Sequence, residues 1–225
     1  MELRNYKADY YINKIKNHEH FSLTRWGDGE WFCATGRQGA NCDKHTYFPE
    51  MSIGLNNALR DDKGYYKAIW DKNHGQIKNN LRIIIPHLER INPNIDWVNA
   101  NIWEQLAING EMGDLVSALE SVNFVIVSNA NKRSLPVKHV DYVEVPVVNC
   151  FLEKERIKKD MVAMTEKYDD VVFGMSASMA TNVIVDELYP LIGEKCSMID
   201  FGSIWEPFVG NNNRSYHREY KSIKL

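Results

Sequence analysis

Two acidic residues separated by one glycine follow an apolar segment near the N-terminus. Residues 21–31 read FSLTRWGDGEW; the apolar segment ends at Trp26, and the two acids are Asp28 and Glu30. In an extended chain, residues two apart project to the same side, so we expect both carboxylates to face one point. Gly27 and Gly29 remove side-chain bulk and let a ligand approach the backbone closely. The alternative is an exposed turn whose acids are only solvated.

Paired carboxylates of this kind suit a hard divalent cation. Mg²⁺ and Mn²⁺ take one or two protein carboxylates and complete their shell with water and phosphate oxygens. Asp28 and Glu30 are therefore predicted metal ligands, and Mn²⁺ or Mg²⁺ is the predicted cofactor. Arg25 precedes them closely enough to pair with an acid or to hold a phosphate.

A second candidate site lies in VVFGMSASMATN, where an apolar run changes to a helical pattern. The strand is expected to end near Phe173, Gly174 allows a tight turn, and Ser176 or Ser178 can cap the next helix. Free backbone N–H groups at a helix N-terminus bind anions, for which a nucleotide diphosphate is a natural guest. A capped helix without a ligand explains the same pattern. Neither GxxxxGK nor GxGxxG occurs in the chain.

Polar residues also follow two other apolar runs. Ser128 ends FVIVS, and Arg133 comes soon after it, within reach of a phosphate or carboxylate. Asn149 follows EVPVV, and its amide can donate and accept at once, which suits a sugar hydroxyl or a base edge. A solvated loop and ordinary turn chemistry explain these residues equally well.

Alternating strand and helix patterns must position these residues. Strands are predicted over 21–26, 123–129, 141–147, 169–176 and 195–202. Helices are predicted over 3–16, 153–168 and 178–192, with 51–70 helical in pieces broken at Gly54 and Gly64, and 95–121 divided at Gly110 and Gly113. Residues 36–50 are expected to form a loop, and 81–86 a strand or part of a helix. The alternation predicts βαβ units and a mainly parallel sheet, which binds ligands beyond the carboxyl ends of its strands.

Composition places the chain among ordinary globular proteins. Its 225 residues suit a single α/β domain over 1–225, with a helical part over roughly 51–121 and a polar, basic tail over 211–225. The net charge of -3 provides no overall attraction to nucleic acid. No apolar run approaches the roughly 20 residues of a membrane span, and the N-terminus has no signal-peptide pattern. The expected location is the cytoplasm.

The four cysteines form no CxxC pair, and we expect free thiols in a reducing compartment. Cys33, Cys42 and His45 match no standard zinc spacing and lack a fourth ligand. Apolar helices such as 178–192 could pack inside the protein or between subunits, so a homo-oligomer is among the expected states.

The sequence resembles a family of bacterial and phage glycosyltransferases with the GT-D-type fold. RWGDGEW resembles the family's Arg-x-Gly-Asp-Gly-Glu signature, in which Asp-x-Glu is the metal motif. VEVPVVNCF, VVFGMSASMATNVIVDEL and SMIDFGSIWEPF resemble later segments of the family in the same order, so the resemblance covers about residues 20–210. This chain departs from the family at Gly-Met-Ser-Ala and at Asp-Phe-Gly-Ser, which bears on the identity of the donor.

The resemblance implies a Rossmann-like α/β fold and a nucleoside-diphosphate sugar as donor, a UDP-sugar first among them. It implies that Asp28 and Glu30 hold the metal at the diphosphate. Glu206, in IWEPF, is the candidate catalytic base, and Asp200 is a second candidate catalytic residue at the end of the last predicted strand. The candidate donor-binding residues are Arg25, Gly27, Gly29, Ser128, Arg133, Asn149, Gly174, Ser176 and Gly202.

The predicted reaction is metal-dependent transfer of a sugar to an acceptor hydroxyl. The acceptor is either a surface glycan or glycoprotein, or a hydroxymethylated pyrimidine in phage DNA. Two alternatives remain open at this point. A metal-dependent phosphohydrolase would use the same acids, and a non-catalytic nucleotide-binding module would need none of them for activity.

Overall fold

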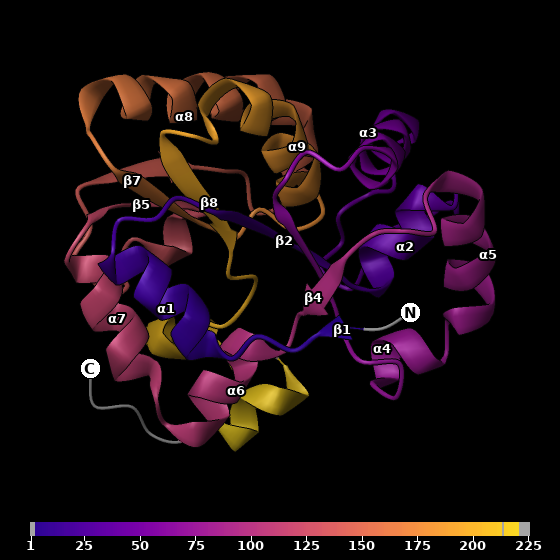
Figure 1. Ribbon diagram of the computed structural model, residues 1–225, viewed down its shortest axis with the longest axis horizontal. Helices are drawn as coiled ribbons and strands as arrows, with labels where there is room; N and C mark the ends of the chain where they lie inside the picture. Colours follow the sequence, from indigo (N-terminus) through magenta and orange to yellow (C-terminus); the bar gives the residue numbers. More distant parts are fainter. Residues whose placement is uncertain (1–2, 213, 221–225) are drawn as a thin grey trace.

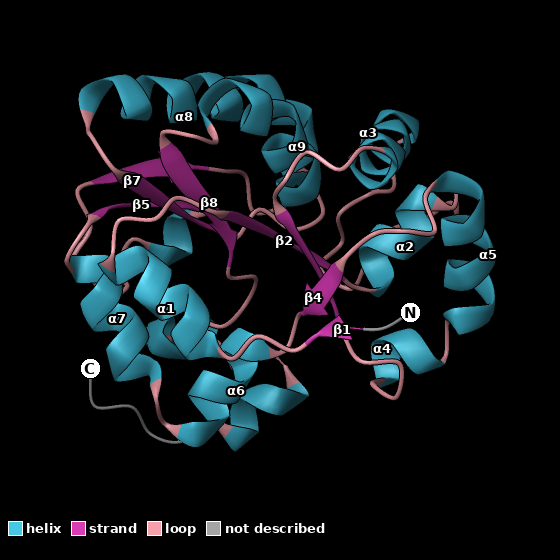
Figure 2. Ribbon diagram, in the orientation of Figure 1, coloured by secondary structure: helices cyan, strands magenta, loops and turns pink. Residues whose placement is uncertain are grey.

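The computed structural model describes residues 3–212 and 214–220. One sheet of parallel strands crosses these residues in the order β1-β4-β3-β2-β8-β7-β5-β6 (Figure 2). The strands are β1 (Leu3–Arg4), β2 (Ser22–Trp26), β3 (Tyr66–Ile69), β4 (Trp97–Asn99), β5 (Asn123–Ser128), β6 (Asp141–Glu144), β7 (Val171–Met175) and β8 (Cys196–Asp200). The α/β, mainly parallel architecture predicted from the sequence is therefore confirmed.

Helices cover both faces of the sheet (Figure 1). Helices α1, α6 and α7 pack together on one face, and α3, α8 and α9 lie on the other. The α-helices are α1 (Ala8–Lys16), α2 (Asp28–Ala34), α3 (Pro49–Arg60), α4 (Gly75–Lys78), α5 (Leu81–Ile91), α6 (Ile102–Asn109), α7 (Met112–Glu120), α8 (Lys154–Lys167) and α9 (Ala180–Ile192). Short 3-10 helices are η1 (Ala130–Lys132), η2 (Cys150–Glu153), η3 (Glu206–Val209) and η4 (Ser215–Glu219).

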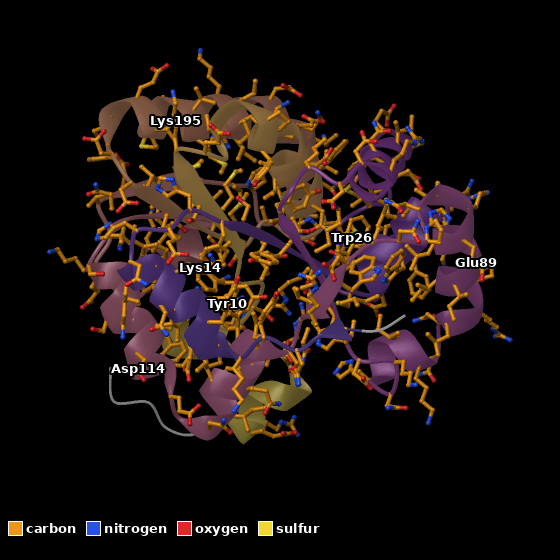
Figure 3. All side chains as sticks on the ribbon, viewed as in Figure 1. Tyr10, Lys14, Trp26, Glu89, Asp114 and Lys195 are labelled. Atoms are coloured by element: carbon orange, nitrogen blue, oxygen red, sulfur yellow. The ribbon has the colours of Figure 1, made fainter. Side chains whose placement is uncertain are left out.

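The central strands are buried along their whole length. Every residue of β2, β7 and β8 is buried, as expected for parallel strands covered on both faces. The core also holds Trp26, which packs against Trp31 and Trp97. Figure 3 shows Trp26 inside the molecule, whereas Glu89 and Asp114 lie on its surface.

Besides β1 at the edge, two short strands inside the sheet were not predicted. Residues 66–69 and 97–99 form β3 and β4, although their surroundings have a helical pattern. Each is too short to show a period of its own, and β3 carries a lysine, Lys67, inside the sheet. Their place in the sheet comes from pairing with β2 and with each other, which is a long-range effect.

Glycine and proline mark helix boundaries less reliably than predicted. Helix α3 runs through Gly54 without a break, because Val183 of α9 packs directly over that glycine. A Cβ atom at position 54 would lie 2.7 Å from Val183 Cγ1. Pro86 lies inside α5, so 81–86 belongs to a helix. Gly110 does end α6 in the left-handed conformation, but Gly113 lies within α7.

The remaining differences concern the chain ends. Residues 3–16 are not one helix, because Leu3–Arg4 joins the edge of the sheet and α1 begins at Ala8. The predicted basic tail over 211–225 lies partly outside the described residues. No helix in the described ranges combines the length and the apolar character that crossing a membrane requires.

Candidate active site

The site opens where two central strands separate. Strands β2 and β8 pair only where β2 begins and β8 approaches its end, Ser22 with Met198 and Leu23 with Ile199. Further along, side chains replace the missing strand partner: Arg25 N–H donates to Asp200 Oδ2 at 3.2 Å, and Asn182 donates to the Arg25 carbonyl at 3.0 Å. The separation leaves a crevice at the carboxyl edge of the parallel sheet, the place predicted for a ligand.

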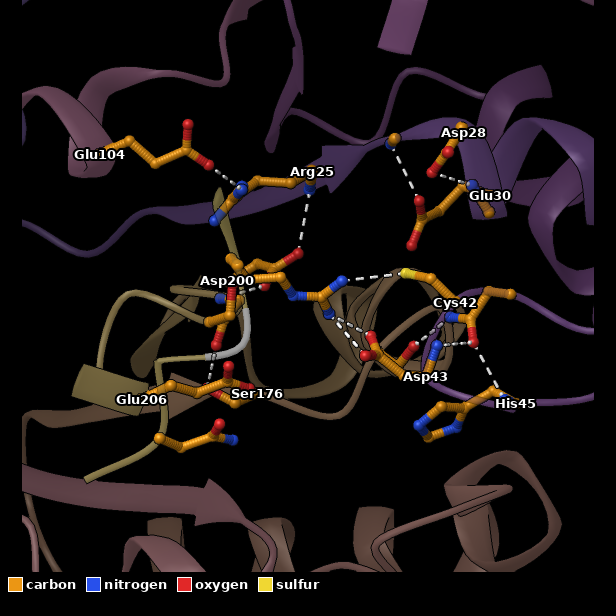
Figure 4. Close-up of a pocket in the computed structure, with 18 of the residues that line it drawn as sticks. Arg25, Asp28, Glu30, Cys42, Asp43, His45, Glu104, Ser176, Asp200 and Glu206 are labelled. Carbon is orange, nitrogen blue, oxygen red and sulfur yellow. Dashed lines mark hydrogen bonds and ion pairs between the residues drawn. The ribbon is translucent and has the colours of Figure 1, made fainter. Parts of the chain in front are cut away.

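A pocket of about 1260 Å³ occupies this crevice (Figure 4). Its walls come from the start of α2, the loop 41–45, the turn after β7, the segment after β8 and one side of α6. Among the described residues the lining is acidic: three basic side chains, Arg25, Lys132 and Arg214, face seven acidic ones. The acidic residues are Asp28, Glu30, Asp43, Glu104, Asp200, Glu206 and Glu219.

Asp28 and Glu30 both line the pocket, but not in the predicted conformation. The chain turns into α2 at Asp28 instead of continuing extended, so residues two apart do not share one side. Unpaired N–H groups at the helix start bind both carboxylates. Gly29 N–H donates to Asp28 Oδ1 at 2.8 Å, and Gly27 N–H donates to Glu30 Oε2 at 2.9 Å. The acids therefore also stabilise the first turn of α2.

Negative charge is concentrated at this end of the pocket. Burial raises the pKa of Glu30 to about 7, and the nearby carboxylates of Asp200 and Asp28 act in the same direction. Burial also raises the pKa of Asp200 to about 6, against the opposing effect of the Arg25 guanidinium. A bound cation would relieve this repulsion.

The donor set suits a metal ion that is shared with a phosphate ligand. No three histidine, cysteine, aspartate or glutamate side chains in the described part of the chain gather into a metal centre by themselves. Asp28 and Glu30 each accept a backbone N–H through one carboxylate oxygen, and both side chains line the pocket. Hard cations that take water and phosphate as their remaining ligands need no more than this.

Arg25 forms part of the pocket wall and has partners there. Its guanidinium donates to Glu104 Oε1 at 3.2 Å and to the Phe201 carbonyl at 3.1 Å, and it lies over the Trp70 ring. Both charged side chains are buried. Sequence reasoning missed Glu104; the available signal was the single charged residue in the largely apolar helical stretch IWEQLAI.

Gly202 fits against this guanidinium. Its φ of +55° is a conformation that favours glycine, and a Cβ there would lie 2.6 Å from Arg25 Nη1. The Ser176 hydroxyl donates to the Gly202 carbonyl at 2.7 Å. Ser176 therefore connects the ends of β7 and β8 across the pocket.

The prediction that Ser176 or Ser178 caps α9 is wrong. Helix α9 has no side-chain cap; the Thr181 hydroxyl, inside the helix, accepts the Ala177 N–H of the preceding turn at 3.2 Å. Ser178 instead has a positive φ of 54°, and its hydroxyl accepts a hydrogen bond from Asn41 at 3.0 Å. This hydrogen bond joins loop 41–45 to the turn before α9. The two segments are far apart in the sequence, so the contact could not be predicted from local pattern.

Glu206 lies across the pocket at the start of η3. Its carboxylate is 3.9 Å from the Lys132 ammonium, and both side chains are largely buried. Burial raises the pKa of Glu206, whereas Lys132 and Arg214 lower it. Burial lowers the pKa of Lys132. Lys132 was not singled out from the sequence, where it is one of many lysines.

Four of the predicted donor-binding residues do not line the pocket. Ser128 is fully buried at the end of β5, and Gly174 lies inside β7, where a Cβ would meet the Phe124 ring at 2.5 Å. Arg133 pairs with Glu144 on the surface. Asn149 does not line the pocket but forms a hydrogen bond with the adjacent loop at Thr46.

Asn149 has a positive φ of 58°, and its side-chain oxygen accepts the Thr46 N–H at 2.8 Å. The pocket thus brings together the other predicted residues, which are Arg25, Gly27, Asp28, Gly29, Glu30, Ser176, Asp200, Gly202 and Glu206. The four cysteines are free thiols.

Comparison with known proteins defines the fold. No protein-family model matches the chain, and neither does any curated protein sequence. Two solved structures are similar over 100% of this chain and 92% of each of theirs, with TM-scores of 0.67 and 0.66 and 16% sequence identity. One is described as a selenomethionine-substituted structure of domain of unknown function 1792, the other as showing that this domain has a distinct glycosyltransferase fold. The chain therefore has a glycosyltransferase-like fold.

Proposed function

We propose that this protein is a metal-dependent glycosyltransferase that uses a nucleoside-diphosphate sugar, with a UDP-sugar as the first candidate. The observation that carries the proposal is the pair of carboxylates, Asp28 and Glu30, at the crevice between β2 and β8. The similarity to a domain described as having a distinct glycosyltransferase fold supports it.

Asp28 and Glu30 would hold Mn²⁺ or Mg²⁺ at the donor diphosphate. The metal neutralises the charge that develops on the leaving diphosphate. Asp200 adds to the negative potential that attracts the cation. Arg25 is fixed behind the site by Glu104 and adds positive charge without needing to reorient.

Glu206 is the proposed base. A base must remove the proton of the acceptor hydroxyl when transfer inverts configuration. The Glu206 carboxylate lines the pocket, and the raised pKa makes it a better proton acceptor than an exposed glutamate. The Lys132 ammonium, 3.9 Å away, opposes the rise in the pKa of Glu206.

A neutral glycan or glycoprotein acceptor suits this pocket better than modified DNA. Seven acidic side chains against three basic ones would repel a polyanion, even with one divalent cation bound. A sugar hydroxyl carries no such penalty. The phosphohydrolase and the nucleotide-binding module remain as outcomes of the experiment.

The test measures UDP release from a series of UDP-sugars, with Mn²⁺ or with a chelator, in the presence of pooled glycans. We expect release that needs both metal and acceptor and is lost in Asp28→Asn and Glu30→Gln. Arg133→Ala is the matched control, because that side chain is exposed outside the pocket. Acceptor-independent release of phosphate would indicate a hydrolase. Metal-independent binding without turnover, unchanged in Asp28→Asn, would indicate a binding module.

A further inference from the structure

The hydrogen bonds of His45 determine which of its ring nitrogens carries the proton. His45 lines the pocket and is only 8% exposed. Its Nδ1 accepts a hydrogen bond from the Asn149 backbone N–H at 3.1 Å. A nitrogen that accepts cannot carry the proton, so the neutral ring carries it on Nε2. Burial lowers the pKa of His45, against the effect of Asp43, which favours this neutral form.

The Nε2–H group has no acceptor among the described residues, while the ring lies in the pocket beside Asp43 (Figure 4). This N–H group is therefore left to water or to a ligand in the pocket. His45 is therefore held in place through one nitrogen and presents the other to a ligand.

The start of α9 lies next to this ring. Asn41 connects the two segments. Its side-chain oxygen accepts the backbone N–H of His45, and its side-chain amide donates to Ser178 Oγ, both at 3.0 Å. On the other side, the Cys150 thiol lies 3.7 Å from His45 Nδ1 and donates to the Ala177 carbonyl at 3.0 Å. The backbone of His45, through Asn41, and its ring, through Cys150, are thus each connected to the turn before α9.

The turn before α9 also carries backbone hydrogen-bond donors. The backbone N–H groups of Ser178 and Met179 have no acceptor in the described part of the chain. They precede α9, a helix of 13 residues whose N-terminus carries partial positive charge. Ser178 lines the same pocket as His45. Backbone donors and a neutral side-chain donor at a helix N-terminus are suited to phosphate oxygens.

We propose that His45 and the start of α9 form the subsite for a phosphate group of the donor, in which His45 Nε2–H donates to a phosphate oxygen. The inference rests on the proposed function and deepens it, because it assigns the diphosphate to a definite wall of the pocket. Donors on this wall would act together with a cation held by Asp28 and Glu30.

The main alternative is that His45 only braces the Asn149 loop. Two substitutions separate these roles. His45→Asn places an amide oxygen near Nδ1, so it can still accept the Asn149 N–H, but it has no donor near Nε2. His45→Gln places its amide near Nε2 and can still donate to a ligand. A bracing role predicts that His45→Gln, which loses the acceptor for the Asn149 N–H, lowers the melting temperature more than His45→Asn does, and that ligand affinity is unchanged in both variants.

The experiment measures the affinity of wild type and both variants for UDP and for inorganic pyrophosphate, each with Mg²⁺. It also follows the His45 ring nitrogens by ¹⁵N NMR in the wild type. We expect His45→Asn to weaken both ligands about tenfold, the loss of one hydrogen bond to a charged group, and His45→Gln to weaken them less. We also expect the proton on Nε2 before ligand is added, and a change in the Nε2 signal on binding.

Unchanged affinity in His45→Asn, a proton on Nδ1 in the free protein, or an Nε2 signal that does not respond to either ligand would overturn the subsite. The glycosyltransferase proposal fails separately. If pyrophosphate binds through His45 but no sugar nucleotide reacts, the subsite is supported and the sugar transfer is wrong. If sugar transfer proceeds equally in wild type and His45→Asn, the glycosyltransferase proposal is supported and the phosphate subsite is wrong. The NMR readout on the wild type decides even if a variant fails to fold.

Discussion

The Glu30 carboxylate accepts the backbone N–H of Gly27 at 2.9 Å, so a predicted metal ligand is also the cap of the helix that carries it. Position 30 therefore has two roles that different substitutions can separate. Glutamine keeps an oxygen for the Gly27 N–H but loses the negative charge, whereas alanine loses both.

Below pH 4.5, where the Glu30 carboxyl is protonated and its charge costs nothing, we expect Glu30→Ala to lower the free energy of unfolding by about 1 kcal/mol, the usual cost of a lost helix cap. Glu30→Gln should keep most of that stability. Both variants should lose metal-dependent turnover. Urea titrations of the metal-free proteins, together with UDP-release assays, measure the two effects. Turnover at the wild-type rate in Glu30→Gln would contradict a metal-binding role.

The pH dependence of stability in the metal-free protein should show the cost of the Glu30 charge. Its folded-state pKa is raised from 4.5 to about 7, so the stability contributed by the protonated carboxyl is complete below pH 4.5 and is lost as the pH rises through 7. Glu30→Gln does not ionise. Its stability relative to wild type should therefore increase between about pH 4.5 and pH 7 and be constant above that range.

Urea midpoints for both proteins at half-unit pH intervals, in the presence of a chelator, measure this difference. Comparing the two proteins cancels the titration of groups that do not interact with Glu30, which leaves Glu30 and its neighbours Asp28 and Asp200 as the source of the difference. A difference that is flat across the range would show that position 30 has an ordinary glutamate environment.

Gly202→Ala tests the contact with Arg25. We expect a loss of about 2–4 kcal/mol, since a side chain must adopt a left-handed φ and also displace the buried guanidinium. Gly210→Ala is the matched control, because its φ of +83° is equally unfavourable while no atom lies within 4 Å of the added Cβ. It should lose only about 1–2 kcal/mol. Equal losses in the two variants would mean that the Arg25 contact has no energetic weight.

The buried pair of Arg25 and Glu104 should be sensitive to removal of the acid. Glu104→Ala leaves the buried guanidinium without its carboxylate, and we expect a loss of about 3–5 kcal/mol. Glu104→Gln keeps an oxygen for the guanidinium and should lose less. Thermal and urea unfolding of both variants measure the difference. If the two variants were equally stable, the hydrogen bond at 3.2 Å would contribute little.

Glu206 and Lys132 can be tested through the pH profile of kcat. Glu206→Gln should lower kcat by about 10²–10⁴-fold with little change in KM, as expected for loss of a general base. Burial raises the pKa of Glu206 and Lys132 opposes this, so Lys132→Met should raise the pKa further. The acidic limb of the profile should then move to higher pH. If the acidic limb of the kcat profile does not move in Lys132→Met, that limb reports the titration of a group other than Glu206.

Several features followed from local sequence alone. The runs that became β5 and β7 are continuous and largely apolar, a strong indication of strands in a parallel sheet, whereas β2 and β8 mix apolar with polar residues. Their alternation with helices was enough to predict the α/β class and a ligand site at the carboxyl edge. The types and spacing of Asp28 and Glu30 were enough to suggest a cation and a phosphate ligand.

Tertiary structure decided the rest, because it depends on which segments meet. The sequence pattern did not reveal that β2 and β8 separate beyond Leu23, that Glu104 would fix Arg25, or that Asn149 would orient His45 from about a hundred residues away. These contacts are between residues far apart in the chain, and a local period carries no information about them. The chemistry of the pocket could be anticipated from residue types, whereas its geometry is a property of the fold.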